Sequence, residues 1–285
     1  YDILRCLVGS EMCIRDRSGT MVLQPFYEQS MDDMASGFFK KLTGKVPAFY
    51  KGIGTYATLK TTQSKAMFDN DSTTYYTSGN GQNTGDWIGA DLGCVRQVSE
   101  VRILQGRNSV DDVDYFDNTV LEYSVDRKEW KALTGELKKQ YIINWKTDSP
   151  VEARYIRIKK LKSDKRNWAA VRTFEVNPTT PERLNFPVEA DNLEAAMYGF
   201  DENPCTSFTN KGTLTMGIEK DVKSYTLLLK LAPGKSLVCR QLNAKGKVLA
   251  TTTIDSSFCK VELVKKAAKL QIEGSAEIFE IIPEK

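Results

Sequence analysis

Between Thr55 and Val176 the chain is a succession of short apolar stretches separated by turn-forming residues. Gly, Asn, Asp and Ser gather at 70–86 and again at 106–118. Many short strands with regular turns predict a β-sandwich or a jelly roll rather than a helical fold. Four stretches have strand composition, three of them with clear alternation: WIGADL (87–92), EVRILQ (100–105), TVLEYSV (119–125) and ARYIRIKKL (153–161).

A polar stretch bracketed by prolines follows, and it predicts a linker at 179–187. The pattern of short strands and turns resumes after it. Residues 188–285 again alternate strand-like segments with Gly, Pro, Lys and Asn turns, and they predict a second, smaller β-sandwich. FDNDSTTYY begins at Phe68 and FDENPCTSF begins at Phe200, 132 positions further on. We interpret this as one fold used twice, with the binding face of the second copy degraded because it lacks tryptophan.

The residues before the first sandwich predict a helix instead of strands. Apolar residues in 22–43 have the spacing of an amphipathic helix that ends before Gly44 and Pro47. We therefore expect 18–47 to be the helical remnant of a preceding domain. Residues 1–17 closely resemble a translated sequencing-adapter read, so they are interpreted as an artefact and excluded from the fold, and the chain is expected to be the tail of a longer protein.

Composition excludes several classes of function. The chain has no histidine, which removes Ser-His-Asp and Cys-His nucleophile systems and His-bearing zinc sites. A net charge of +3 is too small to indicate nucleic acid or an anionic membrane, and no apolar run is long enough for a membrane span. The six cysteines have no metal-binding spacing; Cys205 with Cys239 or Cys259 could pair in an oxidising compartment, although buried free thiols are the preferred interpretation.

Catalysis by this chain alone is an alternative that we rank low. Glycoside hydrolysis needs two carboxylates across a pocket. Asp32-Asp33 falls on the expected helix and Asp111-Asp112 on a loop, and solvated acidic pairs are the simpler interpretation. We therefore predict no catalytic residues here.

The loop that contains Asp69, Asp71 and Thr74 supplies hard oxygen ligands within a few residues. Calcium takes six to eight such oxygens, so the loop is a candidate calcium site. The alternative is an Asx turn that caps a strand without a metal. The corresponding loop at 201–206 contains Pro204 and Cys205, which makes a metal there doubtful.

A second loop, 106–118, carries side chains suited to sugar. Sugar binding needs planar polar groups for hydroxyls and an aromatic face for the C–H side of the ring. A salt-bridged surface loop is the alternative. In contrast, Trp87 and Trp130 sit in apolar strand patterns and are expected to pack in the core. In the 106–118 loop, the candidate sugar-binding side chains are those of Arg107, Asn108, Asp112, Tyr115, Phe116 and Asn118.

Six sequence motifs follow one another in the middle of the chain: FDNDSTTYYTS (68–78), DWIGADLG (86–93), VRILQG (101–106), LEYSVDRKEW (121–130), ARYIRIKKL (153–161) and NWAAVRTFEV (167–176). Together and in this order they resemble the F5/8 type C, or discoidin-like, family, which includes family 32 carbohydrate-binding modules. The resemblance implies an eight-stranded jelly roll at 48–178 with its ligand loops at one end, where Asn167 and Trp168 would join the 106–118 loop. It also implies a structural calcium ion completed by Glu175. Members often use a histidine for sugar, which this chain lacks.

The order of helix, discoidin-like module and further β-domain looks like the C-terminal part of bacterial family 84 glycoside hydrolases, which are β-N-acetylglucosaminidases. The resemblance implies a non-catalytic region that targets a secreted, periplasmic or cell-surface glycosidase to glycans containing galactose or N-acetylglucosamine. Its partners would be those glycans and the upstream catalytic domain. The alternative is a structural or protein-adhesion sandwich, and the polar loops disfavour lipid binding.

Overall fold

The computed structural model describes residues 11–15, 21–25, 27–29, 53–59, 61, 63, 65–78, 81–107, 114–164, 168–203 and 205–285. Described residues before Pro178 belong to one compact unit, and those from Pro178 to Lys285 belong to another. Each unit is mainly antiparallel β-structure, as the sequence predicts.

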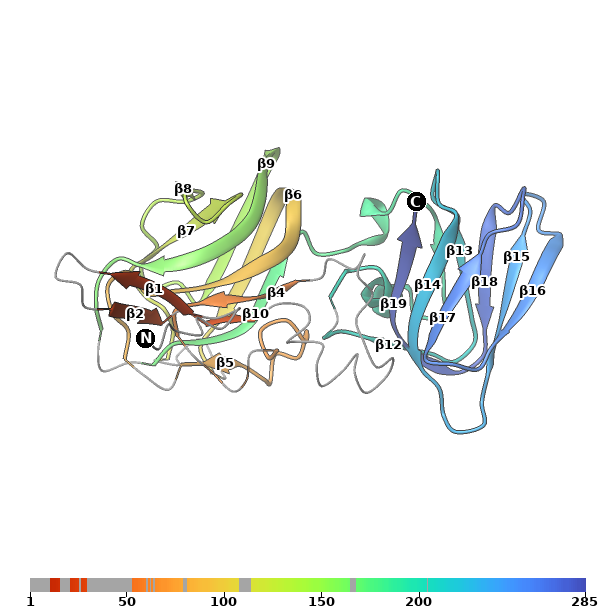
Figure 1. The fold of residues 1–285 in the computed structure, drawn as a ribbon, viewed down its shortest axis with the longest axis horizontal. Coiled ribbons are helices and arrows are strands. Elements are labelled where there is room, and N and C mark those ends of the chain that lie inside the picture. The colour runs from red at the N-terminus through yellow and green to blue at the C-terminus, as the bar shows by residue number, and fades with distance from the viewer. Residues whose placement is uncertain are drawn as a thin grey trace, which may run out of the picture. The chain divides into compact units, whose positions relative to one another are not determined.

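The first unit is built around two 19-residue strands that run side by side (Figure 1). The N-terminal half of β6 pairs with β4 and with the C-terminal half of β9, whereas its C-terminal half pairs with β10 and with the start of β9. Register shifts interrupt the pairing between Asp91 and Arg96 and again between Val98 and Glu100, so both strands pass from one layer to the other. The strands of this unit are β1 (Glu11–Arg15), β2 (Met21–Pro25), β3 (Tyr27–Gln29), β4 (Gly54–Ala57), β5 (Tyr76–Thr77), β6 (Trp87–Gln105), β7 (Thr119–Ser124), β8 (Lys131–Ala132), β9 (Ile142–Lys160) and β10 (Ala170–Val176).

Alternation along these strands places the core between the layers. Ile88 and Ala90 on β6 and Ile156 on β9 are fully buried, and they come from the layer that contains β4 and β7. Ile103 on β6 and Phe174 on β10, at 2% exposure or less, face them from the other layer. Burying such side chains contributes roughly 1.5–3 kcal/mol each, which makes this interior the main source of stability in the unit.

The helix predicted over 22–43 is wrong at its start. Met21–Pro25 pairs with Glu11–Arg15, and Tyr27–Gln29 pairs with β4. Pairing with an existing sheet edge satisfies the backbone along 27–29, and this outweighs the helical periodicity of the side chains. Residues 30–52, which include Asp32 and Asp33, lie outside the described residues, and the interpretation of 1–17 as an artefact stays a prediction.

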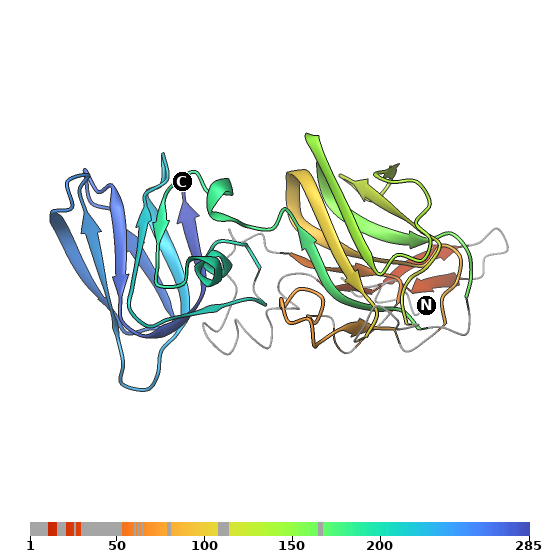
Figure 2. The same cartoon turned by 180° about the vertical axis from the view of Figure 1, so that it is seen from behind.

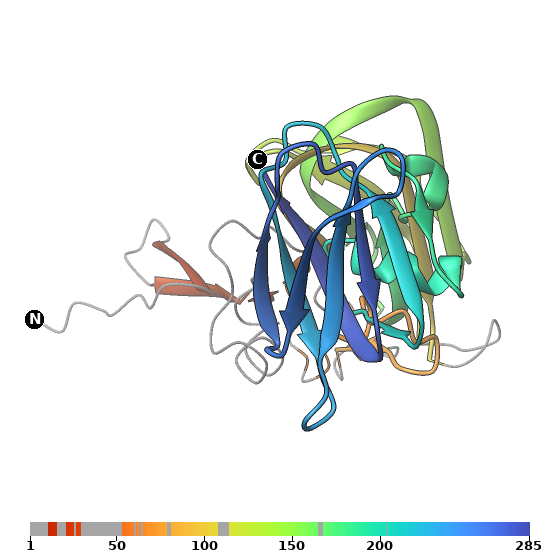
Figure 3. The same ribbon diagram turned by 90° about the vertical axis from the view of Figure 1, so that its right-hand side faces the viewer.

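The second unit is a sandwich of two antiparallel sheets, in the order β11-β13-β18-β15-β16 and β12-β19-β14-β17 (Figures 2 and 3). Its core holds Leu214, Leu227, Leu229 and Ile272, all fully buried. The predicted second β-sandwich is therefore confirmed. Its elements are η1 (Pro181–Arg183), β11 (Val188–Glu189), α3 (Leu193–Ala196), η2 (Met197–Gly199), β12 (Phe208–Asn210), β13 (Thr213–Gly217), β14 (Ser224–Lys230), β15 (Leu237–Leu242), β16 (Val248–Ile254), β17 (Phe258–Glu262), β18 (Lys269–Glu273) and β19 (Ala276–Glu284).

Candidate functional site

The candidate site is a rim of the first unit where three chain segments meet at Gln82. The Gln82 side chain is fully buried, and its Nε2 donates hydrogen bonds to the carbonyl oxygens of Tyr115 (2.9 Å) and Trp168 (2.7 Å). Its backbone also pairs with Asp164 in an isolated bridge. One amide therefore ties together the two turns that the sequence analysis expects at one end of the sandwich, and their meeting is confirmed.

Backbone hydrogen bonds fix the same two turns to the start of β10. The Ala170 N–H donates to the Asp114 carbonyl at 2.9 Å, and the Gly106 N–H donates to the Ala170 carbonyl at 3.0 Å. Gly106 has φ +80°, a conformation that residues with a side chain rarely adopt. The turn therefore leaves β6 sharply and returns to the neighbouring strand.

Arg107 and Asp114 form an ion pair on this rim, with 2.6 Å between Nε and Oδ2. The Arg107 side chain remains 45% exposed, whereas that of Asp114 is 10% exposed. The carboxylate thus orients a guanidinium that still faces solvent. This pair is the salt-bridged loop considered as an alternative, and it leaves the planar donor group accessible.

Aromatic side chains lie on both sides of the meeting point. Trp168 is 46% exposed although its carbonyl is held by Gln82, so the indole projects from an anchored backbone. The rings of Tyr115 and Tyr141 lie 4.4 Å apart between centroids, and burial raises the pKa of the Tyr115 phenol. Sequence reasoning missed Tyr141, which precedes β9; the apolar run at 141–145 was its only signal.

Two of the predicted sugar contacts have structural roles instead. Phe116 is 1% exposed in the interior, where its N–H donates to Gln105 Oε1 at 3.0 Å, so its inclusion as a sugar contact is wrong. Asn118 has φ +47° and its amide donates to Asp117, which indicates a turn residue. Asn108 and Asn167, like Asp111 and Asp112, lie outside the described residues.

Trp87 and Trp130, which were expected to pack in the core, are only half-buried, and they stack against protein side chains at its margin. Trp130 stacks on Tyr56 with 6.0 Å between centroids and 7° between planes. The Arg157 guanidinium lies 3.5 Å from the centroid of Trp130 and 4.8 Å from that of Trp87. The Arg157 guanidinium thus stacks on both tryptophan rings. Glu122 forms an ion pair with Arg157 at 2.7 Å.

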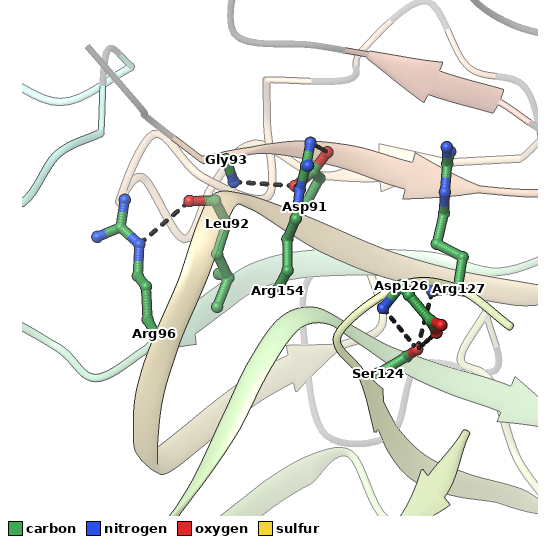
Figure 4. Close-up of polar contacts among 8 residues, drawn as sticks. All are labelled: Asp91, Leu92, Gly93, Arg96, Ser124, Asp126, Arg127 and Arg154. Atoms are coloured by element: carbon green, nitrogen blue, oxygen red, sulfur yellow. Dashed lines mark hydrogen bonds and ion pairs between the residues drawn. The ribbon is translucent and has the colours of Figure 1, made fainter. Parts of the chain in front are cut away.

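Hydrogen bonds of polar and charged side chains hold the backbone near Asp91 on β6 and near Ser124 on β7 (Figure 4). Arg154 binds Asp91 through two hydrogen bonds of 2.9 and 3.0 Å, from Nε and Nη2. Asp126 and Arg127 both donate backbone N–H groups to the Ser124 hydroxyl (Figure 4), which closes the turn after β7. These residues hold the sheet edge and are structural.

The loop predicted to hold calcium gathers oxygens around the Thr74 hydroxyl. Thr74 Oγ1 lies 2.7 Å from Asp69 Oδ2, 3.0 Å from the Asp71 carbonyl and 3.3 Å from the Ala66 carbonyl. One hydroxyl proton can satisfy only one of these three acceptors. Burial raises the pKa of Asp69, which shows that its carboxylate is partly removed from water.

Glu175, the fourth predicted ligand, has another partner. It pairs with Arg102 on the neighbouring strand β6, with 3.5 Å between Nη1 and Oε2. Among the described residues, no three Asp, Glu or Cys side chains gather in a way that could hold a metal ion. The Phe174 N–H donates to the Met67 carbonyl at 2.7 Å, so β10 runs beside the loop, and the role of Glu175 as a calcium ligand stays a prediction.

The second unit repeats the turn of the Asp69 loop 132 positions later. Thr206 Oγ1 lies 2.7 Å from Asp201 Oδ2 and 3.0 Å from the Asn203 carbonyl, and the Asn203 N–H donates to Asp201 Oδ1. The middle residue of each turn has a positive φ, +57° at Asn70 and +55° at Glu202. The disturbance expected from Cys205 is thus absent from the described part of this turn.

Comparison with protein families places the match where the resemblance lies. Residues 54–174 match the F5/8 type C domain. The comparison with curated proteins found no match. No helix among the described residues is long and apolar enough to cross a bilayer.

Several solved structures are similar to parts of the chain. One is the family 32 module of C. perfringens NanJ in complex with galactose, at 18% identity, covering 44% of this chain and 92% of that chain with a TM-score of 0.37. Another is chitosan-binding module 1 of a chitosanase/glucanase from Paenibacillus sp. IK-5, at 18% identity, 45% and 96% coverage and a TM-score of 0.36. A third is allantoicase, at 6% identity, 73% and 80% coverage and a TM-score of 0.44.

Proposed function

We propose that the F5/8 type C domain of this chain binds carbohydrate, without catalysing its breakdown, at the rim formed by Arg107, Tyr115, Tyr141 and Trp168. The observation that carries the proposal is the exposed Trp168 indole, 46% accessible, on a backbone fixed by the buried Gln82. An exposed tryptophan on a rigid support offers a flat apolar face at little entropic cost.

The chemistry of the rim suits a sugar ring. The Trp168 face complements the apolar C–H side of a pyranose, and the half-exposed Arg107 guanidinium offers donors to its hydroxyl oxygens. The Tyr115–Tyr141 pair adds aromatic surface beside them. Because the contacts are few and open to water, we expect weak binding to terminal galactose or N-acetylglucosamine units.

We further propose that the chain serves a larger secreted or cell-surface glycosidase, of the β-N-acetylglucosaminidase type, whose catalytic domain lies upstream. A weak sugar site that is tethered to a catalytic domain raises the effective concentration of substrate at that domain. Support for this parent comes only from the order of the domains. Recovery of the upstream gene tests it directly, and a coding sequence without a glycosidase domain would contradict it.

Calcium in the Asp69 loop is a separate proposal. Oxygens of Asp69, Asp71 and Ala66 lie within 3.3 Å of the Thr74 hydroxyl, and a cluster of hard oxygens of this kind is what calcium binds. Asp69, Asp71 and Thr74 would hold the ion with neighbouring carbonyl groups. Calcium would there stiffen the loop that adjoins β10, because the Phe174 N–H donates to the Met67 carbonyl at 2.7 Å.

Binding is tested with the whole chain on a glycan array and by calorimetry with galactose and N-acetylglucosamine. We expect Trp168→Ala and Arg107→Ala each to weaken binding by about tenfold, a loss of about 1.4 kcal/mol. Phe258→Ala is the matched control for Trp168, since Phe258 is also exposed, at 39%, but lies in the second unit. Arg102→Ala is the control for Arg107, since its side chain is 54% exposed and also ion-paired.

Both controls should bind like the wild type, and all four variants should keep their circular dichroism spectra. Undiminished binding by Trp168→Ala and Arg107→Ala together would remove the proposed site. If no glycan binds at all, the alternative of a structural or adhesion module is favoured. Turnover of an aryl β-N-acetylglucosaminide above the buffer rate would overturn the non-catalytic assignment.

Calcium is tested by thermal unfolding with a chelator and with calcium at about 100 times its Kd, where binding would stabilise the fold by about 2.7 kcal/mol. We expect the melting temperature of the wild type to rise with calcium and that of Asp69→Asn to stay constant. Asp148→Asn, an exposed aspartate on β9, is the control and should respond like the wild type. An equal response in Asp69→Asn would place the ion elsewhere.

A further inference from the structure

Two cysteines point into the same core from opposite sheets of the second unit. Cys239 on β15 is 1% exposed, and its register partner on β18 is the buried Ile272. Cys259 on β17 is half-buried, and its register partner on β14 is the buried Leu227. Since directly opposed residues of paired strands share a face, both thiols lie inside the sandwich.

The sheets come close together beside these cysteines. The buried Gln241 side chain, two positions after Cys239 on the same face of β15, donates to the Glu262 carbonyl at 2.8 Å. It also accepts a hydrogen bond from the Val264 N–H at 2.7 Å. A single glutamine on β15 of one sheet is thus hydrogen-bonded directly to the end of β17 in the other sheet.

The pKa values of the two thiols also indicate that Cys239 and Cys259 are neighbours. Burial and, to a smaller extent, the negative charge of Cys259 raise the pKa of Cys239 to about 12. Burial also raises the pKa of Cys259. Cys239 and Cys259 are both free thiols.

Topology separates Cys205 from β17. Cys205 lies just before β12, and β12 and β17 are the two opposite edges of the four-stranded sheet, with β19 and β14 between them. Strands in a sheet are about 4.8 Å apart, so three such steps give roughly 14 Å, more than a disulfide can span. The pairing of Cys205 with Cys259 considered from the sequence is thereby disfavoured.

We propose that Cys239 and Cys259 form a disulfide that joins the two sheets of the second unit when the chain meets a low-molecular-weight disulfide, such as oxidised glutathione. The thiolate of Cys259, the more exposed of the two, attacks the disulfide, forms a mixed disulfide and releases one glutathione thiolate. The thiolate of Cys239 then attacks the Cys259 sulfur and displaces the second glutathione. Two protein thiols lose two protons and two electrons, and one glutathione disulfide becomes two glutathione molecules.

A cross-link here would close a loop between positions 239 and 259 and restrict the unfolded chain. It would also clamp β17, the edge strand of one sheet, to β15 of the other. The reduced unit already has a complete core, so the bond adds stability to a fold that forms without it.

The test equilibrates the full chain with glutathione buffers of increasing oxidised fraction, blocks free thiols with iodoacetamide and maps disulfides by peptide mass spectrometry. We expect a linked Cys239–Cys259 peptide and protection of both residues from alkylation. The melting temperature of the second unit should rise by about 10 °C or more on oxidation. Because both thiol pKa values are raised, the rate of formation should increase with pH.

Variants separate this bond from other pairings. Cys259→Ser, at the half-buried position, should lose both the linked peptide and the oxidative rise in melting temperature, and Cys239→Ala should do the same. Cys205→Ser should behave like the wild type. Continued alkylation of Cys239 and Cys259 in fully oxidised buffer, or a bond from either residue to Cys205, would overturn the proposal.

Discussion

At the scale of single residues, the rim depends on one buried amide. Gln82 has no exposed surface, and both protons of its Nε2 go to main-chain carbonyls of different turns. Such an amide acts as a strut, because carbonyl groups that are buried without a donor lose their solvation. The contact residues Trp168 and Tyr115 are thus placed by a residue that never reaches the surface.

We expect Gln82→Met to destabilise the domain by about 1–3 kcal/mol and to weaken glycan binding, because it keeps the volume and removes both donors. Urea unfolding followed by tryptophan fluorescence and calorimetry with the glycan measure the two effects. Gln97→Met is the control, because Gln97 is an exposed glutamine with a single side-chain hydrogen bond to Glu152. Binding as tight as in the wild type would show that the turns hold without the strut.

At the scale of elements, the pairing of β6 with β9 is what makes a sandwich from the first unit. Gly89 of β6 lies opposite Arg157 of β9. A methyl group added at Gly89 would lie 2.3 Å from the Ile156 carbonyl oxygen and 2.8 Å from Arg157 Cβ. The same arginine carries the stack on Trp130, so strain there reaches the aromatic cluster.

Gly89→Ala should therefore destabilise the first unit by about 1–3 kcal/mol through overpacking. Gly135→Ala is the matched control, since an added methyl group at Gly135 meets no atom within 4 Å. Thermal unfolding measured by tryptophan fluorescence compares the two. Equal melting temperatures for both variants would mean that β6 and β9 separate without cost at this point.

At the scale of the whole molecule, the two units carry different reporters and different buried charges. All four tryptophans, at 87, 130, 145 and 168, lie in the first unit. The second unit holds a carboxyl pair in which desolvation raises the pKa of the half-buried Asp201 to about 7, and the neighbouring Glu280 is 1% exposed. An acid with a raised pKa favours the folded state while it is protonated.

The second unit should therefore be most stable below about pH 4 with respect to this group, and it should lose that stability as the pH rises through about 7. Hydrogen exchange of peptides from 208–282, in the presence of a chelator, measures this loss between pH 5 and pH 8. Asp201→Asn should flatten the dependence. Tryptophan fluorescence should not report it, and an unchanged pH dependence in Asp201→Asn would assign the titration to another group.

The sequence by itself determined the two β-sandwiches, their boundary near 178 and the spacing of the repeated turns. Alternation, turn residues and the 132-residue offset are local properties that survive without contacts. It also indicated Trp168, because an aromatic residue after a polar run has little strand context. It indicated Arg107 because the 106–118 loop carries side chains suited to sugar. The sequence misled at 21–29, where helical spacing yielded to pairing with β4.

Only the tertiary structure decided which side chains share a surface. Phe116 and Trp168 are both aromatic loop residues, yet one is 1% and the other 46% exposed, because backbone hydrogen bonds to distant strands set the direction of each turn. The same holds for Gln82, Tyr141 and the Cys239–Cys259 neighbourhood, whose partners are remote in sequence. Local pattern fixes whether a segment is a strand; long-range pairing and burial fix which of its side chains remain available to a ligand.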